Sequence, residues 1–385
     1  MKAHRDLPRV IIITHEFFPY PGGIAVYVRE MALALAAAGR KVEVWCPPAA
    51  ALANAGKQWA FAVTPIAGNR GTQGWNCRWS TARLWRKRAR DIREADVWLA
   101  EPGAVLTAFY DFLFRLPKPG RLTLTLHGSE ILNFTRAPHR RCLFKRLLGK
   151  ADAVSVLSRF NAQMLAERTG FDPSKVRLAP GALRSDFTTQ PRGDTTQDEA
   201  SRVRLCIVAR IHPRKGQHAL LEATALLPEA IRARLCIQLA GRIVDSGYLE
   251  LLEKLAAAAG VPVAFSGEVS DAELPHIYAN SDIFALTSMP LPGSIEGFGL
   301  VYLEAGAHGL PVLAHDTGGV RDAVVADETG LLVPPCDRKA LANALARLVE
   351  SPALRQRLGE NGRRHALSFS WEKSAQALLG IKDEE

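Results

Sequence analysis

No apolar run in this sequence reaches the roughly 18–20 residues that a transmembrane helix needs, so no membrane-spanning segment is expected. The first residues, MKAHRDLPRVIIITHEF, lead from a polar start into a short buried strand and lack the apolar core and cleavage site of a signal peptide. No CxxC pair occurs, and several of the six cysteines lie within apolar runs. This favours buried thiols in a reducing compartment over disulfides or zinc. Together these absences predict a cytoplasmic protein.

Two short sequence motifs are also missing. There is no GxGxxG, which argues against a dinucleotide-binding fingerprint, and there is no DxD pair of carboxylates. Without such a pair, a divalent metal that bridges a diphosphate is not supported. No metal and no cofactor are therefore expected.

The chain has an ordinary amino-acid composition and a strong positive charge. Its 385 residues exceed the usual size of one hydrophobic core and predict two domains. Hydrophobic residues make up 48% and charged residues 23%, as in other globular proteins. The formal net charge of +10 suits an anionic small molecule, an anionic membrane surface or nucleic acid.

The hydrophobic pattern alternates short continuous runs with longer amphipathic stretches, which is typical of parallel α/β units. It starts with RVIIIT and restarts with RLCIVARI after a polar stretch without periodicity. We predict an α/β chain of two Rossmann-like, doubly wound domains that face each other across a cleft, with ligands at the carboxyl ends of the strands. The expected parts are a domain at 1–182, a linker at 183–201, a domain at 202–367 and a last helix at about 368–385. The clearest other helices are 24–38, ended by Gly39, and 337–350.

The stretch EGFGLVYLEA at 296–305 carries two carboxylates, Glu296 and Glu304, around a glycine-rich turn and an apolar helix. The glycines let a ligand approach the backbone, and the first turn of a helix offers unpaired N–H groups to phosphate. Eight helical residues would span roughly 12 Å, which fits a nucleotide diphosphate-sugar. One carboxylate would then hold sugar hydroxyls and the other the ribose. The alternatives are an N-cap role for Glu296 and a solvated helix face for Glu304.

The loop RIHPRKG at 210–216 follows a buried strand and carries three cations. Arg210 and Lys215 are expected to hold phosphate, since arginine binds it through two hydrogen bonds and lysine acts as a point charge. Arg214 is the weaker candidate because it neighbours Lys215 and is expected to face solvent. Loop solubility is the alternative for any one of these cations, and it weakens for three in one strand-end loop.

The first domain offers two further candidates. PGGIAVYV at 21–28 is a Gly-Gly turn that opens a helix and would approach a phosphate or an acceptor, although such turns are common. His127, in TLTLHGSE, ends a strand. An imidazole there can bond a substrate hydroxyl or transfer a proton, and a structural role is the equal alternative.

Two basic stretches complete the set. WSTARLWRKRARDIR at 79–93 holds six cations and two tryptophans, and HRRCLFKRLLGK at 139–150 mixes cations and apolar residues at helical spacing. The second is expected either to lie on anionic lipid or to be a surface helix with its apolar face in the core. The first alternative would place the protein at the inner face of the cytoplasmic membrane. No recognised nucleic-acid module accompanies the charge, so nucleic acid is not an expected partner.

Together these motifs resemble the retaining GT-B glycosyltransferases of glycosyltransferase family 4. The resemblance covers nearly the whole chain and rests on GGIAVYVREMALALAAAGRKVEV, LHG, ARIHPRKG, FSGEVSDAELPHIYANSDIFALTS and EGFGLVYLEAGAHGLPVLAHDTGGVRDAV. It implies a GT-B fold and transfer of a sugar from a nucleotide-diphosphate sugar to a saccharide or lipid-linked acceptor. It also implies retention of the anomeric configuration and a last helix that crosses back onto the first domain.

The resemblance implies roles for individual residues as well. The implied catalytic residues carry charge or a transferable proton: His127, Arg210, Lys215 and Glu296. The implied donor-binding residues lie in loops or near the start of helices: Gly23, Val269, Gly297, Phe298, Gly299, Leu300 and Glu304. Within these sets, Glu296 would bind the sugar hydroxyls, Glu304 the ribose and Val269 the nucleobase through its backbone. His127 would contact the transferred sugar and Gly23 the phosphate.

The sequence departs from the family at two places. Gly39-Arg40 replaces a frequent Gly-His, and Ala25 stands where an acidic residue often follows the Gly-Gly turn, so the acceptor contacts of that loop stay undefined. Two other interpretations stay open: a nucleotide-sugar epimerase or phosphorylase on the same fold, and a non-catalytic basic protein that binds nucleic acid or membrane. The sequence makes no prediction about the donor base, the sugar, the acceptor or the oligomeric state.

Overall fold

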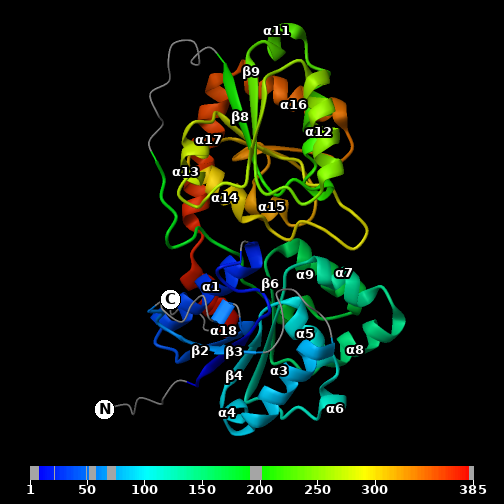
Figure 1. Cartoon of the computed structure of the whole chain (residues 1–385), viewed down its shortest axis with the longest axis vertical. Coiled ribbons are helices and arrows are strands. Elements are labelled where there is room, and N and C mark those ends of the chain that lie inside the picture. The colour runs from blue at the N-terminus through cyan, green and yellow to red at the C-terminus, as the bar shows by residue number, and fades with distance from the viewer. Residues whose placement is uncertain are drawn as a thin grey trace. The chain divides into compact units, whose positions relative to one another are not determined.

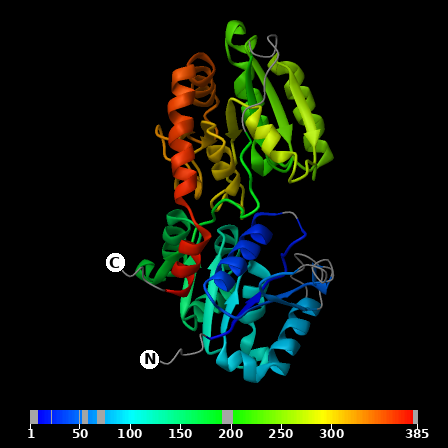
Figure 2. The same cartoon turned by 90° about the vertical axis from the view of Figure 1, so that its left-hand side faces the viewer.

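The computed structural model describes residues 8–20, 22–48, 50–51, 58–66, 75–190 and 202–380. They form two compact units: one holds the described residues up to Arg184 together with those from Ser370 on, and the other is Ser185–Phe369. Each unit is a parallel sheet with helices on both faces (Figures 1 and 2), which confirms the predicted α/β class. Residues 191–201 of the expected linker and 381–385 of the expected last helix lie outside the described residues.

The first unit is built on a seven-stranded sheet with the order β3-β2-β1-β4-β5-β6-β7. Its strands are β1 (Val10–Ile13), β2 (Val42–Cys46), β3 (Ala62–Pro65), β4 (Asp96–Leu99), β5 (Arg121–Leu126), β6 (Ala153–Val156) and β7 (Val176–Leu178). The run RVIIIT, predicted as a strand, forms β1 in the buried centre of this sheet. The edge strand β3 was not predicted, because its residues are exposed or half-buried and form no apolar run.

Helices connect these strands on both faces of the sheet. They are α1 (Gly23–Ala37), α3 (Trp75–Lys87), α4 (Ala89–Glu94), α5 (Pro102–Phe109), α6 (Asp111–Phe114), α7 (Ser129–Thr135), α8 (Pro138–Leu148) and α9 (Arg159–Thr169). Helix α1 confirms the predicted helix to within one residue at each end, and Gly39 after it has φ +77°, a left-handed conformation that favours glycine.

The last helix, α18 (Trp371–Leu379), belongs to the first unit although it is the final helix of the described chain. The Trp371 Nε1–H donates to the Leu183 carbonyl at 2.6 Å, and the Ser374 hydroxyl donates to the Pro180 carbonyl at 2.6 Å. The Trp371 ring also lies edge-on to the ring of Tyr27 on α1, with 5.5 Å between their centroids. These contacts fasten α18 to α1 and to the chain that follows β7.

The second unit repeats the same strand order in a six-stranded sheet, β10-β9-β8-β11-β12-β13. Its strands are β8 (Val203–Val208), β9 (Leu235–Ala240), β10 (Val263–Gly267), β11 (Ile283–Leu286), β12 (Val312–His315) and β13 (Gly330–Val333). In both sheets the connections reverse direction beside the first strand, between β1 and β4 and between β8 and β11. Such a switch point is where doubly wound sheets open a crevice for ligands.

The helices of the second unit are α10 (Gln217–Ala225), α11 (Glu229–Arg232), α12 (Ser246–Ala259), α13 (Leu274–Ala279), α14 (Leu300–Ala307), α15 (Val320–Ala323), α16 (Arg338–Glu350) and α17 (Pro352–Ser368). The Asp337 side chain caps α16, which agrees with the predicted amphipathic helix.

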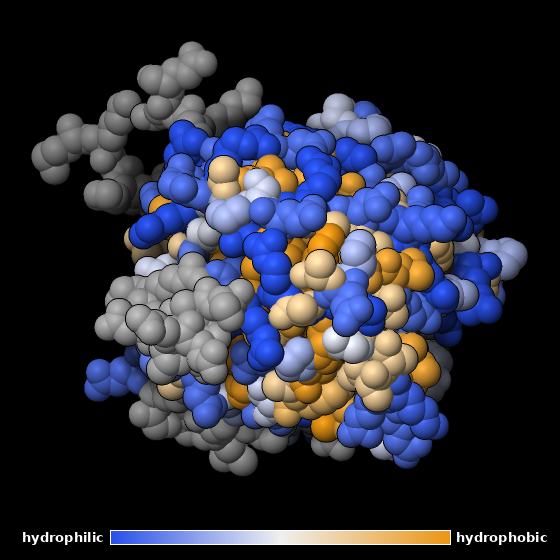
Figure 3. Space-filling view, turned by 90° about the horizontal axis from the view of Figure 1, so that it is seen from above, coloured by the Kyte–Doolittle hydropathy of each residue, from blue (hydrophilic) through white to orange (hydrophobic). Residues whose placement is uncertain are grey.

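Hydrophobic side chains gather near the middle of the face in Figure 3, with hydrophilic ones around them. In the part of the chain that the structure describes, no helix has the length and apolar character to cross a membrane.

Candidate active site

Glu296 lies at the centre of a buried polar cluster in the second unit. Its side chain is held in the loop between β11 and α14, and Glu296 is only 9% exposed. Three donors reach its Oε2 atom: Lys215 Nζ at 2.7 Å, Ser288 Oγ at 3.0 Å and Arg214 Nη1 at 3.2 Å. The cluster therefore joins two cations, a hydroxyl and a carboxylate.

The two cations reach Glu296 because the loop after β8 packs against the end of β11. Arg214 and Lys215 lie in a short 3-10 turn (Pro213–Lys215) that ends at Gly216. Gly216 has φ +68°, and a Cβ there would lie 1.8 Å from the Thr287 carbonyl oxygen, so only glycine fits. The Thr287 hydroxyl in turn donates to the Gly216 carbonyl at 2.7 Å. The cluster thus forms at the β8–β11 switch point.

The cluster keeps Glu296 ionised. Burial alone raises the pKa of the carboxyl, but the charges of Lys215 and Arg214 and the hydrogen bonds from Lys215 and Ser288 outweigh it and lower the pKa to about 2. Burial, with help from Arg214 and Arg210, lowers the pKa of Lys215 despite the attraction of Glu296. Lys215 and Arg214 on one carboxylate, with the charge of Arg210 acting on Lys215, leave an excess of positive charge that suits an anionic ligand.

The relative placement of the three cations differs from the prediction. The expectation that Arg214 faces solvent is wrong, since its side chain is 15% exposed and bonds Glu296. Arg210 is the exposed member, and its charge reaches the cluster through its proximity to Lys215. A residue-by-residue view of the loop missed Arg214 because the 3-10 turn, which points Arg214 and Lys215 toward the same carboxylate, is not visible in the sequence.

The helix after Glu296 begins later than predicted. Gly299, with φ +92°, is the N-cap residue of α14 and Leu300 is its first residue, so neither the N-cap alternative for Glu296 nor the helical span of 12 Å holds. Phe298 is 2% exposed, and its ring packs on Phe369 at 5.6 Å. Only the backbone of Phe298 is therefore placed to meet a ligand. Gly297, Gly299 and Leu300 are all half-buried.

Glu304 is buried on α14 and not solvated. It is 7% exposed, and the Tyr278 hydroxyl on α13 donates to its Oε2 atom at 2.9 Å. The alternative of a solvated helix face is therefore wrong. Val269 lies half-buried in the loop between β10 and α13, in the same unit.

In the first unit, His127 follows β5 and is fixed on two sides. Its Nε2 atom lies 2.8 Å from the Ala100 carbonyl, and because a carbonyl only accepts, Nε2 carries the proton. Its backbone N–H donates to the buried carboxyl of Glu130, and burial raises the pKa of that carboxyl. Gly23 is the exposed first residue of α1, and a Cβ there would meet nothing within 4 Å. Protein packing therefore does not demand glycine at position 23.

The first unit has a polar pair of its own that the sequence analysis did not single out. His15 follows β1 and Glu101 follows β4, so the pair lies at the switch point of this sheet. His15 Nδ1 is 2.6 Å from Glu101 Oε1, and both residues are almost fully buried. Burial lowers the pKa of His15. The hydrogen bonds and charges of Cys77 and Glu101 outweigh this effect and raise the pKa from 6.5 to about 10. The signal in the sequence was a polar THE directly after an apolar strand.

The two basic stretches differ in the structure. The apolar face of α8 is buried, with Phe144, Leu147 and Leu148 at most 3% exposed, so this helix covers the core and has no apolar face to insert into lipid. On α3, by contrast, Trp85 is 2% exposed while Trp79 is 52% exposed. Among the described residues, no group of three or more His, Cys, Asp and Glu is placed to hold a metal ion.

Comparison with known proteins assigns the family. A family model described as "Glycosyl transferases group 1" matches residues 196–365, and one described as "Glycosyltransferase Family 4" matches residues 21–186. The chain is 31% identical to a D-inositol 3-phosphate glycosyltransferase of Actinosynnema mirum over 93% of this chain and 91% of the relative.

A second relative is the GDP-mannose-dependent alpha-(1-6)-phosphatidylinositol monomannoside mannosyltransferase of Mycolicibacterium smegmatis, which is 32% identical over 68% of this chain and 69% of its own. The crystal structure of HepE from Anabaena in complex with UDP and glucose superposes with a TM-score of 0.74 at 20% identity, covering 98% of this chain and 100% of HepE. This likeness supports the GT-B fold. The chain therefore belongs to the GT-B glycosyltransferases of glycosyltransferase family 4, with a C-terminal part of the glycosyl transferases group 1 type.

Proposed function

We propose that this glycosyltransferase moves a hexose from a nucleotide-diphosphate donor to an acceptor hydroxyl, with retained anomeric configuration and without a metal. The observation that carries the proposal is the state of the Glu296 carboxylate. Its Oε2 is held by Lys215, Arg214 and Ser288, whereas no described residue donates a hydrogen bond to Oε1. A fixed, ionised carboxylate with one open oxygen suits a sugar hydroxyl, and the cations beside it suit a diphosphate.

The proposed reaction breaks the bond between the anomeric carbon and the diphosphate oxygen, and the electron pair leaves with the diphosphate. The acceptor oxygen forms its bond on the same face of the sugar, and its proton passes to the departing phosphate oxygen. Lys215, Arg214 and Arg210 would stabilise the charge that grows on the diphosphate, together with the first-turn N–H groups of α14. Because these groups are preorganised, they favour the transition state over the bound donor.

The remaining predicted residues keep their roles as part of this proposal. Glu304, oriented by Tyr278, would accept the ribose hydroxyls, and the backbone of Val269 would meet the base. His127 would donate to or accept from the transferred sugar through Nδ1, since Nε2 is already bonded to the Ala100 carbonyl. Gly23 would let the first turn of α1 approach the phosphate.

The relatives suggest which donors and acceptors to test first. The relative from Mycolicibacterium smegmatis is named a GDP-mannose-dependent alpha-(1-6)-phosphatidylinositol monomannoside mannosyltransferase, and HepE was crystallised with UDP and glucose. We propose a saccharide or lipid-linked alcohol as the acceptor, within polysaccharide or glycolipid synthesis. The N-terminal unit, matched by the Family 4 model, is the proposed acceptor-binding part.

The test is a mass-spectrometric panel of nucleotide sugars, read for donor hydrolysis and for transfer to glycolipid and saccharide acceptors with EDTA present. NMR of the product reports its anomeric configuration. We expect Lys215→Ala to lower kcat/KM by about 10²–10³, because it removes a charge that stabilises the leaving group. Lys254→Ala, on the exposed face of α12 in the same unit, is the matched control. Equal turnover by both variants would refute the role of Lys215, and an epimerised donor without transfer would indicate an epimerase.

A further inference from the structure

The buried pair of His15 and Glu101 lies at the switch point of the first sheet and has no part in the proposed reaction. His15 follows β1 and Glu101 follows β4, and they are 1% and 3% exposed. His15 Nδ1 lies 2.6 Å from Glu101 Oε1, and the His15 backbone N–H donates to the same oxygen at 3.1 Å. The side chain and the backbone of His15 are thus fastened to one carboxylate.

The Glu101 carboxylate also begins helix α5. Its Oε2 accepts from the Gly103 N–H and its Oε1 from the Ala104 N–H, each at 2.6 Å. Four donors around one carboxyl favour the ionised form, which only accepts. Burial raises the pKa of Glu101, but the hydrogen bond and charge of His15 and the two amides outweigh burial and lower the pKa.

The other ring nitrogen of His15 faces helix α3. Its Nε2 lies 3.4 Å from the Thr81 hydroxyl, which gives its own proton to the Cys77 carbonyl at 2.9 Å. Thr81 is therefore left to accept from Nε2, as Glu101 accepts from Nδ1, so both ring nitrogens carry protons and the ring is positively charged. The pKa of His15 agrees with this charge, because burial lowers it but the titratable neighbours Cys77 and Glu101 raise it to about 10.

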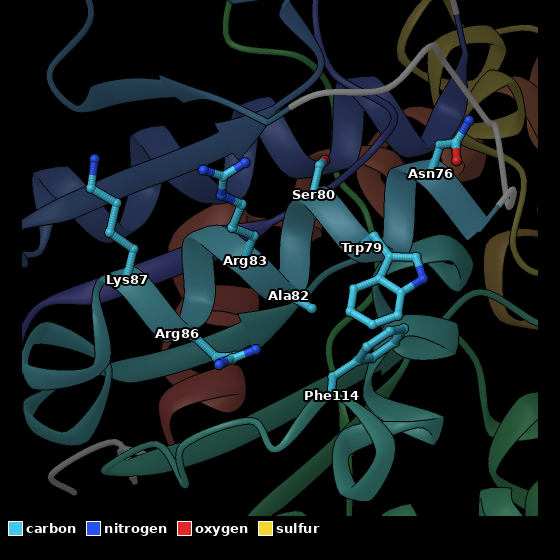
Figure 4. Close-up of a pocket in the computed structure, with 8 residues that line it drawn as sticks. All are labelled: Asn76, Trp79, Ser80, Ala82, Arg83, Arg86, Lys87 and Phe114. Carbon is cyan, nitrogen blue, oxygen red and sulfur yellow. The ribbon is translucent and has the colours of Figure 1, made fainter.

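Helix α3 closes the pair off from water. Cys77 and Thr81 lie on its buried side, whereas Figure 4 shows other side chains of α3 that project from the helix: Ser80, Arg83 and Lys87. Removing two charges from water is costly, and apolar side chains would fill the same space at less cost. The pair lies at the carboxyl ends of the strands, where doubly wound sheets bind ligands, and this position indicates a role in the site.

The pair fixes the start of the loop between β1 and α1. Its bonds to His15 hold the backbone where the loop leaves the strand. The next turn of the loop is fastened to the same place, since the Thr14 hydroxyl donates to the Glu16 carbonyl at 2.7 Å. The loop leads to the glycine turn at which α1 begins with Gly23. The path of the loop therefore depends on a contact with the start of α5.

Gly103 leaves the room that the pair needs. A Cβ at this position would lie 2.9 Å from His15 Nδ1 and 3.0 Å from Glu101 Oε1. The φ of Gly103 lies outside the left-handed region that favours glycine. The requirement for glycine therefore comes from the pair and not from the backbone, and a larger residue would push His15 and Glu101 apart.

We propose that His15 and Glu101 are positioning residues for the acceptor: their ion pair holds the loop between β1 and α1 in the conformation that receives the acceptor alcohol. Because both are buried, they act through the loop and do not touch substrate. This inference rests on the proposed function, since it takes the first unit as the acceptor-binding part. His127 keeps its place without the pair, because the Ala100 carbonyl that it bonds is held in the sheet by the Ala100 N–H bond to Ile13 at 3.1 Å. The pair should therefore affect transfer and leave donor hydrolysis unchanged.

The first experiment needs neither donor nor acceptor. Hydrogen–deuterium exchange of the full chain reports local opening of the loop. We expect His15→Ala to speed the amide exchange of residues 14–20 about tenfold or more, because a hydrogen bond to a charged group is lost. His15→Asn should restore slow exchange, since the asparagine amide can replace Nδ1 as the donor to Glu101. Unchanged exchange in His15→Ala would overturn the proposal.

A glycine variant repeats this test without changing either charged residue. Gly103→Ala should speed exchange of the same loop as His15→Ala does, because its Cβ separates the pair. Gly149→Ala is the matched control in the same unit, since its Cβ would lie 3.6 Å from the nearest atoms, an ordinary contact. Circular dichroism melts establish that each variant is folded. Equal exchange in the two glycine variants would contradict the role of the pair.

The second experiment measures the charge on the ring. In spectra of the chain with nitrogen-15 histidine, one of the ten histidines should stay doubly protonated at pH 8. Its signal should be absent from His15→Asn. A His15 ring that is neutral at pH 8 would overturn the ion pair.

The third experiment separates transfer from donor hydrolysis. UDP-glucose and GDP-mannose serve as donors, and D-inositol 3-phosphate and phosphatidylinositol as acceptors. We expect His15→Ala to raise the acceptor KM on the order of tenfold, with unchanged donor hydrolysis, and His15→Asn to recover most of this loss. An unchanged acceptor KM, or an equal loss of hydrolysis and transfer, would refute the acceptor role. Absence of turnover with every donor would overturn the proposed function, and the exchange experiment would still decide whether the pair holds the loop.

Discussion

The buried carboxylate of Glu296 makes a prediction about stability that is separate from catalysis. Its pKa lies at about 2, against an ordinary value of 4.5. Since one pKa unit corresponds to about 1.4 kcal/mol, the ionised form gains about 3 kcal/mol in the folded chain. Glu296→Gln removes this charge and leaves Lys215 and Arg214 without their common partner. We expect the variant to lose about 3 kcal/mol of unfolding free energy near neutral pH.

The pH dependence identifies the cause. Because the folded pKa lies below the unfolded one, the contribution is complete above about pH 4.5 and is lost as the pH falls toward 2. The difference in unfolding free energy between the original chain and Glu296→Gln should therefore shrink from about 3 kcal/mol at pH 6 toward zero near pH 2. Other carboxylates also titrate over this range, but they do so in both proteins and cancel in the difference.

The assay is urea unfolding at a series of pH values, followed by circular dichroism. Tryptophan fluorescence is unsuitable, because all seven tryptophans lie in the other unit. Glu253→Gln, at an exposed position of α12, is the matched control and should change stability by less than about 0.5 kcal/mol. A difference for Glu296→Gln that stays constant from pH 6 to pH 2 would refute the reasoning, because the loss would then come from packing and not from the charge.

Two further predictions concern the switch points. Gly216→Ala should destabilise the second unit by more than about 2 kcal/mol in urea unfolding, because its Cβ would meet the Thr287 carbonyl. Gly170→Ala has a similar φ and open space, and should cost only about 1 kcal/mol. Because the His15 pKa is raised from 6.5 to about 10, its contribution is complete below pH 6.5 and is lost toward pH 10. The stability of the original chain relative to His15→Asn should therefore fall across that range, and an unchanged difference would contradict the pairing with Glu101.

Lys215 and Glu296 could be predicted as site residues because charged side chains stand there in loops that follow apolar strands. Lys215 and Glu296 each follow an apolar strand, and strand ends are where a doubly wound sheet binds ligands. Their direct contact was not predictable, because it depends on Thr287 and Gly216 closing two loops that are about 70 residues apart in the chain. For the same reason Arg214 was assigned to solvent.

The elements of the fold also divide into those that the sequence predicts and those that it does not. Buried strands such as β1 can be recognised in the sequence as continuous apolar runs. A helix end such as Gly39 can be recognised because its left-handed backbone conformation favours glycine. The exposed edge strand β3 has neither signal and is defined only by its pairing with β2. The apolar residues of α8 and of α3 look alike in the sequence, since periodicity reports a face but not what covers it.

The sequence by itself determined the α/β class, the two doubly wound units and the strand-end loops that hold Lys215 and Glu296, because these depend on the order of apolar runs and on short-range backbone preferences. Only the tertiary structure decided that Arg214 joins Glu296, that Tyr278 holds Glu304 and that His15 pairs with Glu101. It also decided which tryptophans of α3 face water. The physical reason is that these contacts join distant segments, and their geometry is set by how the sheets and helices pack.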